Sequence, residues 1–492
     1  MSEAEQVPRD LAPEPGSPTT ARLAGLAVVS LIAVTAALQQ AGAGRPSEPV
    51  PTAGAGDVMA EIAPPDTQFE LIAKLMTKIG MWFDPDLRDA FAGQLDGLAR
   101  TPEDVLRAAI VAAELHGGDL SEDALADVRE RATAGSPLRR DAEIAEFIYR
   151  PPPAPDAPPA ENGAAPAADA EMIGFVKRHG WIGRVAAARA NGIDDADYQR
   201  LIGGGGAILG VLGVVFIGGG LATLLGLVLL VVAGLAWSRT PPATRLRPPP
   251  PGGSVFLETV AMFIAAFIAL KLCGAVVAVV FDDDAATTFA LVAQWTLLLT
   301  ALWPGVRGVP LRRAFGTLGL HRGRGVLREL GSGVIGYIAC LPFFIAGVLV
   351  STALMLLWAR ARAMLGLPEG EPPSNPIVEI IAEQRGSWLF VMFALLAALW
   401  APMAEETIFR GALYGHLRRR WHWFLAATMT ALTFGLMHGY QFLMLGPVIG
   451  LGFGFALLRE WRGSLIAPMT AHFIHNTTLL VVMTTILTML GD

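Results

Sequence analysis

Charge and cysteine are scarce in this sequence. Only 16% of its 492 residues are charged, against 53% that are hydrophobic, and so apolar a composition excludes an ordinary soluble globular protein. The two cysteines, Cys273 and Cys340, both fall within apolar runs, which excludes a disulfide framework and a CxxC metal site. The net charge of -7 is modest and basic residues come in short clusters beside apolar runs. This pattern excludes a nucleic-acid-binding footprint.

Long apolar runs are what the sequence has instead. A helix needs about 20 apolar residues to cross a bilayer, and about nine runs approach that length. We therefore predict an all-α fold, a polytopic transmembrane helical bundle of about nine spans. The runs are 23–38, 207–237, 255–281, 287–303, 330–358, 388–414, 423–440, 441–458 and 464–490.

Arginines near the ends of these runs predict the orientation. They cluster in four loops and alternate with arginine-poor turns such as the one at Asp282. The positive-inside rule places all four loops, and with them the N-terminus, in the cytosol. Because arginine outnumbers lysine and alanine is abundant, as in GC-rich bacterial genomes, we expect a multi-pass protein of the bacterial cytoplasmic (inner) membrane. The loops are 239–247, 307–328, 418–420 and 459–462.

Composition along the chain predicts five parts. The N-terminal tail is polar and lacks the basic region of a signal peptide, which favours an uncleaved anchor for the first apolar run, whereas the small residues at 41–44 would suit cleavage. The parts are a disordered cytosolic tail (1–22), an anchor (23–39), an extracytosolic helical domain (40–202) with a Pro/Ala-rich linker (151–170), accessory transmembrane spans (203–329) and a C-terminal membrane domain (330–492).

The helical domain shows apolar residues at helical spacing and polar residues suited to N-caps. His116 and His179 are interpreted as surface histidines. The domain could engage an extracytosolic protein partner, or it could be a spacer. The expected helices are 69–83, 84–98, 102–116, 122–134 and 140–149, followed after the linker by one helical stretch at 171–202.

Four other features favour structural roles. Glycines at 203–206 and 218–220 lack the lysine and strand of a phosphate loop, so close helix packing or a flexible entry is expected. Lys271 lies within an apolar run, where snorkelling or a local partner is as plausible as a functional charge. Residues 375–384 have the pattern of an amphipathic interfacial helix, which could gate access to the C-terminal domain or only cap a loop.

Polar side chains interrupt three of the last apolar runs, where an ionisable group costs a few kcal/mol and marks a functional candidate. Residues four apart share a helix face. Glu406 and Arg410 can therefore pair, while Glu405, turned about 100° away, stays free. Phe434 with His438 and His472 with Asn476 repeat this spacing, and His475 lies off that edge as a weaker candidate.

Four of these residues are expected at similar depth in the membrane. At about 1.5 Å per residue they lie roughly 15–23 Å from the cytosolic ends of their helices. A carboxylate, two imidazoles and a carboxamide at one depth could hold and polarise a water molecule. The same cluster could be a hydrogen-bond network in a non-catalytic binding or immunity protein, or mark a transporter pathway. The four are Glu405, His438, His472 and Asn476.

The three pairs also carry a family resemblance. They match the motifs EExxxR, FxxxH and HxxxN in order and spacing. In this the chain resembles the CAAX protease and bacteriocin-processing (CPBP) family, also called Abi. That family includes type II CAAX prenyl endopeptidases and lysostaphin-resistance-like proteins. The resemblance covers roughly 330–490, so the C-terminal domain is expected to be an intramembrane protease, a hydrolase acting on a membrane-associated peptide or protein.

The resemblance also implies roles for the residues. Glu405 and His438 would activate the hydrolytic water, His472 and Asn476 would stabilise the oxyanion, and Glu406, Arg410 and Phe434 would support the site. The family is labelled metalloprotease, but a glutamate mechanism without metal is also argued for it. Glu405, His438 and His472 could form a three-ligand zinc site, although the chain lacks HExxH. No other cofactor is expected.

Overall fold

The structure, a computed structural model, contains no strand among the residues it describes, which confirms the all-α prediction. These residues form two compact units. The membrane unit comprises Met1–Pro46, Ile217–Pro373 and Gln384–Val482, and the helical unit Ser47–Phe216, Ser374–Glu383 and Met483–Asp492. The described residues are 15–43, 67–99, 101–132, 136–149, 169–239, 253–281, 283–367, 378, 381 and 386–491.

Seven helical segments among the described residues are long and apolar enough to cross a bilayer, and the chain is a multi-pass membrane protein. Two of the nine predicted spans correspond to shorter helices, α19 (Trp423–Leu436, 14 residues) and α20 (Gly446–Arg462, 17 residues). The seven are Pro18–Ala37, Ala196–Ala236, Val255–Val280, Ala285–Val306, Val326–Met364, Trp388–Arg418 and Ile466–Leu490.

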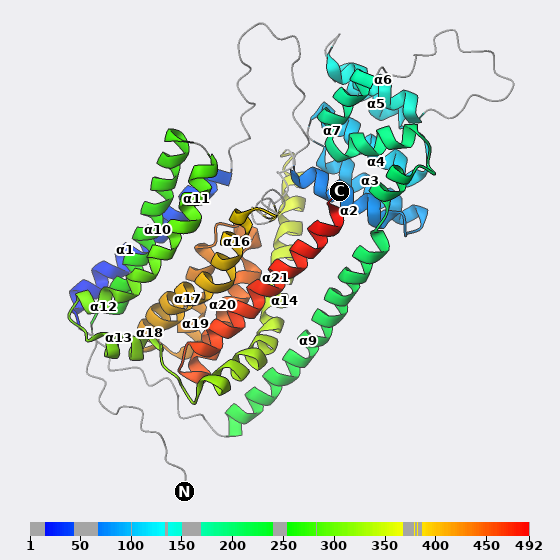
Figure 1. The fold of residues 1–492 in the computed structure, drawn as a ribbon. Helices are drawn as coiled ribbons and strands as arrows, with labels where there is room; N and C mark the ends of the chain where they lie inside the picture. The colour runs from blue at the N-terminus through cyan, green and yellow to red at the C-terminus, as the bar shows by residue number, and fades with distance from the viewer. Residues whose placement is uncertain are drawn as a thin grey trace, which may run out of the picture. The chain divides into compact units, whose positions relative to one another are not determined.

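In the membrane unit, α14 (Val326–Met364) packs along α20, and α19 packs along the other side of α20 (Figure 1). Glycines allow the first contact to be close. A Cβ atom on Gly450 would lie 2.1 Å from the Phe343 carbonyl oxygen, and one on Gly454 would lie 2.5 Å from Cys340 Sγ. A side chain at Gly450 would require a backbone shift, and one at Gly454 would displace Cys340, so these glycines allow the close spacing of the two helices.

A second group of helices joins the unit through α10 (Val255–Val280). Helix α1 (Pro18–Ala43) packs along α10, and α10 in turn packs against the run that carries Glu405 and Glu406. Val28, Val260, Phe409 and Phe434 belong to one buried apolar cluster. The remaining elements here are α9 (Gly205–Arg239), which begins in the helical unit, α11 (Asp283–Ala293), η1 (Gln294–Leu302), α12 (Trp303–Val306), α13 (Leu311–Leu318) and η4 (Phe442–Met444).

The run Trp388–Arg418 is not a uniform α-helix. It passes through α16 (Trp388–Leu395), η2 (Leu396–Trp400), α17 (Ala401–Glu405), η3 (Glu406–Leu413) and α18 (Tyr414–Arg418), and η2 and η3 are π-helical. The Ala401 N–H donates to the Leu396 carbonyl, five residues back. The next donor in that register would be residue 402, a proline without an N–H. Short π-helical segments of this kind often occur at functional sites.

The helical unit follows the predicted segments closely at first. The residues expected to cap helices do so, because the side chains of Asp84, Thr101 and Ser121 accept hydrogen bonds from backbone N–H groups of the first turn. The helices are α2 (Thr67–Gly80), α3 (Pro85–Leu98), α4 (Pro102–His116), α5 (Glu122–Arg131) and α6 (Pro137–Tyr149).

The helical stretch predicted at 171–202 is present as two helices, α7 (Asp169–Ala190) and α8 (Ala196–Ile202), and α7 kinks where Gly180 has φ of 57° and ψ of −131°. One prediction for this unit is wrong. His179, expected at the surface, is fully buried, with Nε2 3.0 Å from Asp141 Oδ2. Its neighbours Lys177 and Arg178 are basic, and from them neither its burial nor the kink at Gly180 was expected. His116 lies at the surface beside Asp89, as predicted.

The remaining structural predictions have mixed outcomes. Gly205 packs closely, since a Cβ there would lie 1.9 Å from the Lys78 carbonyl oxygen, whereas 218–220 lie inside α9 with open space around them. Lys271 is exposed on α10 and has a local partner, the Phe267 ring, 5.2 Å from its Nζ. The predicted helix 375–384 lies almost wholly outside the described residues.

Candidate active site

Glu406 and Arg410 form the buried base of the site. Arg410 Nη1 donates to Glu406 Oε1 at 2.9 Å, and both side chains are fully buried, so the predicted pairing is confirmed. Arg410 Nη2 donates to the Gly452 carbonyl on α20 at 3.1 Å, and its guanidinium lies 4.2 Å from the centre of the Phe434 ring. The pair thus ties η3 to α19 and α20.

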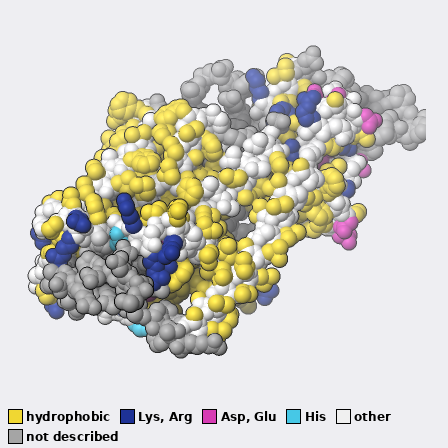
Figure 2. Space-filling view, turned by 60° about the horizontal axis from the view of Figure 1, so that its bottom comes forward, with side chains coloured by type: hydrophobic (Ala, Val, Ile, Leu, Met, Phe, Trp, Pro, Cys, Tyr) yellow, Lys and Arg dark blue, Asp and Glu magenta, His cyan; other side chains and the backbone are white. Residues whose placement is uncertain are grey.

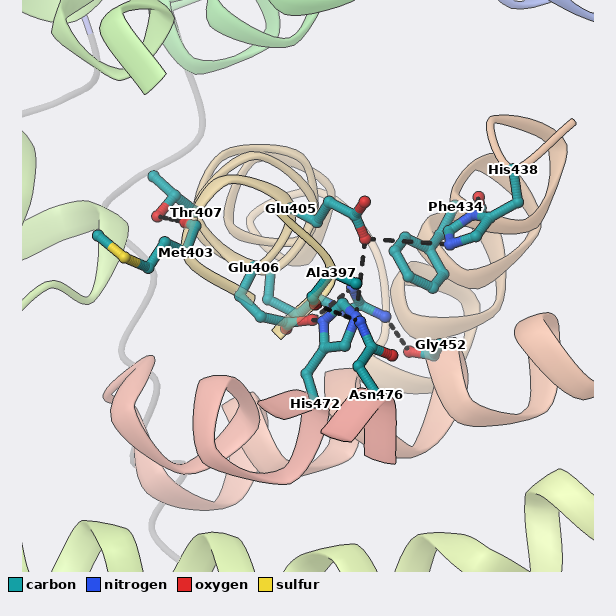
Figure 3. A network of polar contacts seen from close by, with 11 residues as sticks. Ala397, Met403, Glu405, Glu406, Thr407, Phe434, His438, Gly452, His472 and Asn476 are labelled. Carbon is teal, nitrogen blue, oxygen red and sulfur yellow. Dashed lines mark hydrogen bonds and ion pairs between the residues drawn. The ribbon is translucent and has the colours of Figure 1, made fainter. Parts of the chain in front are cut away.

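His472, on α21 (Ile466–Leu490), connects this base to the exposed part of the site. Its Nδ1 lies 2.9 Å from Glu406 Oε1, and its Nε2 lies 3.8 Å from Glu405 Oε2 (Figure 3). An ionised carboxylate only accepts hydrogen bonds, so Nδ1 carries the hydrogen. Glu406 therefore fixes the orientation of the ring and directs Nε2 toward Glu405.

His438 approaches Glu405 from the other side. Helix α19 ends at Leu436, so His438 lies in the following turn and not on the helix edge that we predicted. Its Nδ1 donates to the Phe434 carbonyl at 2.8 Å, in the last turn of α19, where the same carbonyl also accepts the Met437 N–H. Nε2 therefore has a free lone pair and lies 3.9 Å from Glu405 Oε2.

Glu405 stands at the centre of these groups, as Figure 3 shows. Its side chain is 17% exposed and that of His438 is 24% exposed, whereas Glu406 has none of its surface accessible. Oε2 of Glu405 is buried and accepts no hydrogen bond from the described residues. Buried polar atoms normally have a partner, so Oε2 is available to accept a hydrogen bond from water or substrate.

Asn476 is held by the irregular helix opposite. Its Nδ2 donates to the Ala397 carbonyl at 2.8 Å. In the π-helical register of η2, this carbonyl would accept the N–H of residue 402, five residues later. Residue 402 is a proline and has no N–H. Because a carboxamide nitrogen has two hydrogens, one N–H of Asn476 stays available after this bond is made. Because Pro402 cannot pair with the Ala397 carbonyl, that carbonyl accepts the hydrogen bond that orients Asn476.

The donor set also fits a zinc ion by chemical type. Two imidazoles and a glutamate are ligands that zinc enzymes use, and each imidazole has its Nδ1 held by an outer acceptor. Zinc ligands about 2.1 Å from the ion in tetrahedral geometry lie about 3.4 Å from one another. The separations here are 3.8 and 3.9 Å, and no group among the described residues already has metal-binding geometry. The two Glu405–histidine separations are therefore a few tenths of an ångström longer than those around a bound zinc ion.

Comparison with known proteins places this site within a family region. Residues 387–478 match the family "Type II CAAX prenyl endopeptidase Rce1-like". This confirms the resemblance carried by the three motifs, over a shorter stretch than the expected 330–490. All four candidate residues lie inside the Rce1-like region, whereas α1, α10 and the helical unit lie outside it. The family is one of peptidases.

Two curated relatives, both from Bacillus subtilis (strain 168), also match. "Uncharacterized protein YpbD" is 31% identical over 125 residues, which are 25% of this chain and 61% of that protein. "Putative membrane peptidase YdiL" is 29% identical over 87 residues, which are 18% of this chain and 35% of that protein. The chain therefore spans less than two thirds of either relative. No solved structure matches it.

Sequence reasoning missed two parts of this site. It paired Glu406 with Arg410 alone, but Glu406 also accepts a hydrogen bond from His472, 66 residues further along the chain. It also missed the link from Asn476 to the Ala397 carbonyl. Pro402, three residues before Glu405 in an apolar helix, was the available signal for the second, because an internal proline leaves a carbonyl unpaired.

Proposed function

We propose that the chain is an intramembrane endopeptidase that hydrolyses a peptide bond of a membrane-associated protein or peptide. The observation that carries this proposal is the position of Glu405 Oε2, which accepts no hydrogen bond from the part of the chain that the structure describes and lies within 4 Å of the Nε2 atoms of His438 and His472. A structural network would not need a carboxylate oxygen left unpaired in a low-dielectric site. The Rce1-like match supports the same reaction class.

In the proposed reaction, Glu405 is the general base. It takes a proton from a water held between its carboxylate and His438 Nε2, and the water oxygen bonds to the carbonyl carbon of the scissile peptide. The resulting oxyanion accepts the second N–H of Asn476, and that of His472 Nε2 when its ring is protonated. The carbon–nitrogen bond then breaks, and the proton held by Glu405 passes to the leaving amine.

Metal activation of the water is the alternative within the same function. Glu405, His438 and His472 would hold the ion, which would lower the pKa of bound water and polarise the peptide carbonyl. Glu406 would then act as the outer acceptor that orients His472. Chelator sensitivity distinguishes the two forms of the proposal.

The test is cleavage of a lipid-anchored reporter peptide library by the purified full chain in detergent. Wild type is compared with Glu405→Ala and His438→Ala, each with and without a strong chelator. We expect cleavage by wild type and at least a hundredfold loss in both variants. Loss of wild-type cleavage in chelator, restored by zinc, would assign the metal form. His116→Ala, which changes an exposed histidine of the helical unit, is the matched control and should cleave as wild type does.

If wild type and both variants are equally folded and none cleaves any member of the library, the endopeptidase proposal is wrong. The cluster would then be structural, as in a binding or immunity protein.

The location that we propose is the bacterial cytoplasmic membrane with the N-terminus inside, which places residues 40–202 outside the cytosol, where they could bind a protein partner or the substrate. Unchanged cleavage of the native substrate after deletion of 45–200 would contradict a recruiting role.

A further inference from the structure

A basic segment of the chain connects α12 to α14, outside the Rce1-like region. It comprises α13 and the loop that leads into α14, and its arginines are at positions 307, 312, 313, 322, 324 and 328. No aspartate or glutamate occurs between residues 285 and 328. We call residues 307–328 the arginine segment.

Four of the six arginines have guanidinium groups with no partner among the described residues. All four are exposed, and none of their guanidinium groups forms a hydrogen bond or an ion pair with that part of the chain. Arg307, in contrast, donates to Glu258 Oε2 at 2.8 Å, and Arg313 is also engaged. The four are Arg312, Arg322, Arg324 and Arg328.

The first carboxylate after the arginine segment is already paired. Glu329 is fully buried, and its two oxygens accept hydrogen bonds from Arg462 Nε at 2.9 Å and Arg462 Nη2 at 2.6 Å. Its Oε1 also accepts the backbone N–H of Arg324 at 3.0 Å. Glu329 therefore balances the charge of Arg462, and it holds Arg324 by the backbone without using its guanidinium group.

The loop of the arginine segment is held in place by further hydrogen bonds. The Gly319 carbonyl accepts the Leu465 N–H at 2.9 Å, and the His321 carbonyl accepts the Ser464 hydroxyl at 2.8 Å. These bonds fix the backbone and leave the exposed side chains for a ligand. A surface that is ordered before binding loses less conformational freedom when a ligand arrives.

Buried Arg459 connects the arginine segment to the helix run of the candidate active site. Its Nη2 donates to the carbonyls of Thr317 and Leu318, at the end of α13, at 3.2 and 3.1 Å. Its Nε donates to the Arg410 carbonyl on η3 at 3.3 Å. A ligand that holds α13 would therefore stabilise packing that also includes η3.

The surroundings of the arginine segment suit the membrane interface. The helical segments before and after it, Ala285–Val306 and Val326–Met364, are long and apolar enough to cross a bilayer, so the segment lies where the chain leaves and re-enters the membrane. Exposed leucines accompany the arginines, and Leu327 is 84% exposed. Figure 2 shows lysine and arginine side chains gathered at one end of the membrane unit, where Figure 1 places α12 and α13, and bordered by hydrophobic side chains.

We propose that the arginine segment is a docking surface for anionic phospholipid headgroups, whose phosphates bind the four guanidinium groups. Charge complementarity favours this ligand, because anionic lipids attract arginines next to transmembrane helices and guanidinium groups pair well with phosphate. The exposed leucines favour a membrane over a soluble acidic partner, because they can enter the outer acyl region. The proposal is independent of the proposed peptidase activity, because it uses none of the active-site residues.

The test is native mass spectrometry of the full chain released from micelles that contain equal amounts of dioleoyl phosphatidylglycerol and dioleoyl phosphatidylcholine. Wild type should retain phosphatidylglycerol in preference to phosphatidylcholine. Each arginine near a membrane surface is worth about a fivefold change in binding. Arg322→Gln should therefore reduce the preference about fivefold, and the double variant with Arg324→Gln about 25-fold. Arg322→Lys with Arg324→Lys should keep the preference, because it keeps both charges.

The matched control removes two charges elsewhere. Arg139→Gln with Arg184→Gln changes exposed arginines of the helical unit. This variant should keep the wild-type preference. Because the substituted arginines of the arginine segment are exposed and their guanidinium groups have no partner among the described residues, their variants should melt at the wild-type temperature.

Three outcomes would overturn the proposal. They are equal retention of the two lipids by wild type, an equal loss of preference in the control variant, and displacement of phosphatidylglycerol by an equal concentration of a decaglutamate peptide. The last would assign the surface to an acidic protein partner. Glu405→Gln should abolish cleavage and keep the lipid preference, so failure of either proposal can be recognised separately.

Discussion

His472 donates to Glu406 across 2.9 Å, from α21 to η3. The same carboxylate oxygen accepts from Arg410, so one buried glutamate holds a cation and an imidazole at once. The other ring nitrogen of His472, Nε2, is directed toward Glu405. The two adjacent glutamates therefore differ: Glu406 holds Arg410 and His472, whereas Glu405 is the general base of the proposed reaction.

This difference predicts that two isosteric substitutions, both of which reduce cleavage, have different effects on stability. Glu406→Gln removes the partner of a fully buried arginine, and breaking such a pair costs about 3–5 kcal/mol. We expect a clear fall in the melting temperature of the detergent-solubilised protein together with loss of cleavage. Differential scanning fluorimetry of Glu406→Gln and Glu405→Gln side by side checks this. Equal melting temperatures for the two variants would show that Glu406 does not brace the fold.

Pro402→Ala should lower activity without lowering stability. The new N–H at residue 402 can pair with the Ala397 carbonyl, which releases the Asn476 carboxamide. Loss of one oriented oxyanion donor lowers kcat about 10²–10³-fold, and Asn476→Ala should reach a similar rate. The melting temperature should stay the same or rise, because alanine suits a helix interior better than proline. Wild-type kcat in Pro402→Ala would refute the orienting role of the proline.

Phe434→Leu should affect stability and activity together, but mildly. The ring lies 4.2 Å from the Arg410 guanidinium and its centre is 4.4 Å from that of the His438 ring. Loss of a desolvated cation–π contact costs about 2 kcal/mol. Phe424→Leu, at a phenylalanine of α19 that is 55% exposed, is the control and should change neither quantity. Equal effects of the two substitutions on melting temperature would contradict this assignment.

Stability of the helical unit should fall as the pH is lowered below 6.5. Burial holds the pKa of His179 below its ordinary value of 6.5, although Asp141 beside it acts in the opposite direction. At a pH below 6.5 and above the lowered pKa of the folded state, His179 is protonated in the unfolded chain and neutral in the folded chain. Protonation therefore favours unfolding. Burial alone would raise the pKa of Asp141, but its bonds with Arg178 and His179 hold it below 3.8. Its contribution is therefore lost only at more acidic pH.

Hydrogen exchange of α7 amides in the full chain, corrected for intrinsic rates, measures this effect. Protection should drop by at most tenfold per pH unit between pH 6.5 and 5. His179→Gln should flatten that dependence, whereas His116→Gln, at an exposed histidine, should preserve it. A wild-type protection factor that does not change with pH would contradict the assignment.

The sequence predicted the local structure well where local chemistry determines it. Pro85 and Pro102 begin α3 and α4 directly after the capping residues Asp84 and Thr101, because a first-turn proline and a polar cap act within a few residues. The apolar runs likewise located the membrane helices. The i, i+4 spacing of Glu406 and Arg410 correctly indicated a pair.

Features that depend on tertiary structure were not predicted. The π-helical register around Glu405 arises where several helices pack together, and a pattern of period 3.6 contains no sign of it. His438 was expected on a helix edge, but α19 ends before it. The bond between His472 and Glu406 joins helices far apart in sequence, and the buried partner of His179 is Asp141, 38 residues before it. In each case the neighbours that decide the outcome come from elsewhere in the fold.

The most direct test of the account is the initial cleavage rate of Glu405→Gln on the best reporter peptide found for wild type. Glutamine keeps the size of the side chain and removes the base, so the account predicts a fall of about 10²–10⁴-fold with an unchanged melting temperature. A Glu405→Gln protein that cleaves at the wild-type rate would show that Glu405 does not activate the water, and the central claim would be wrong.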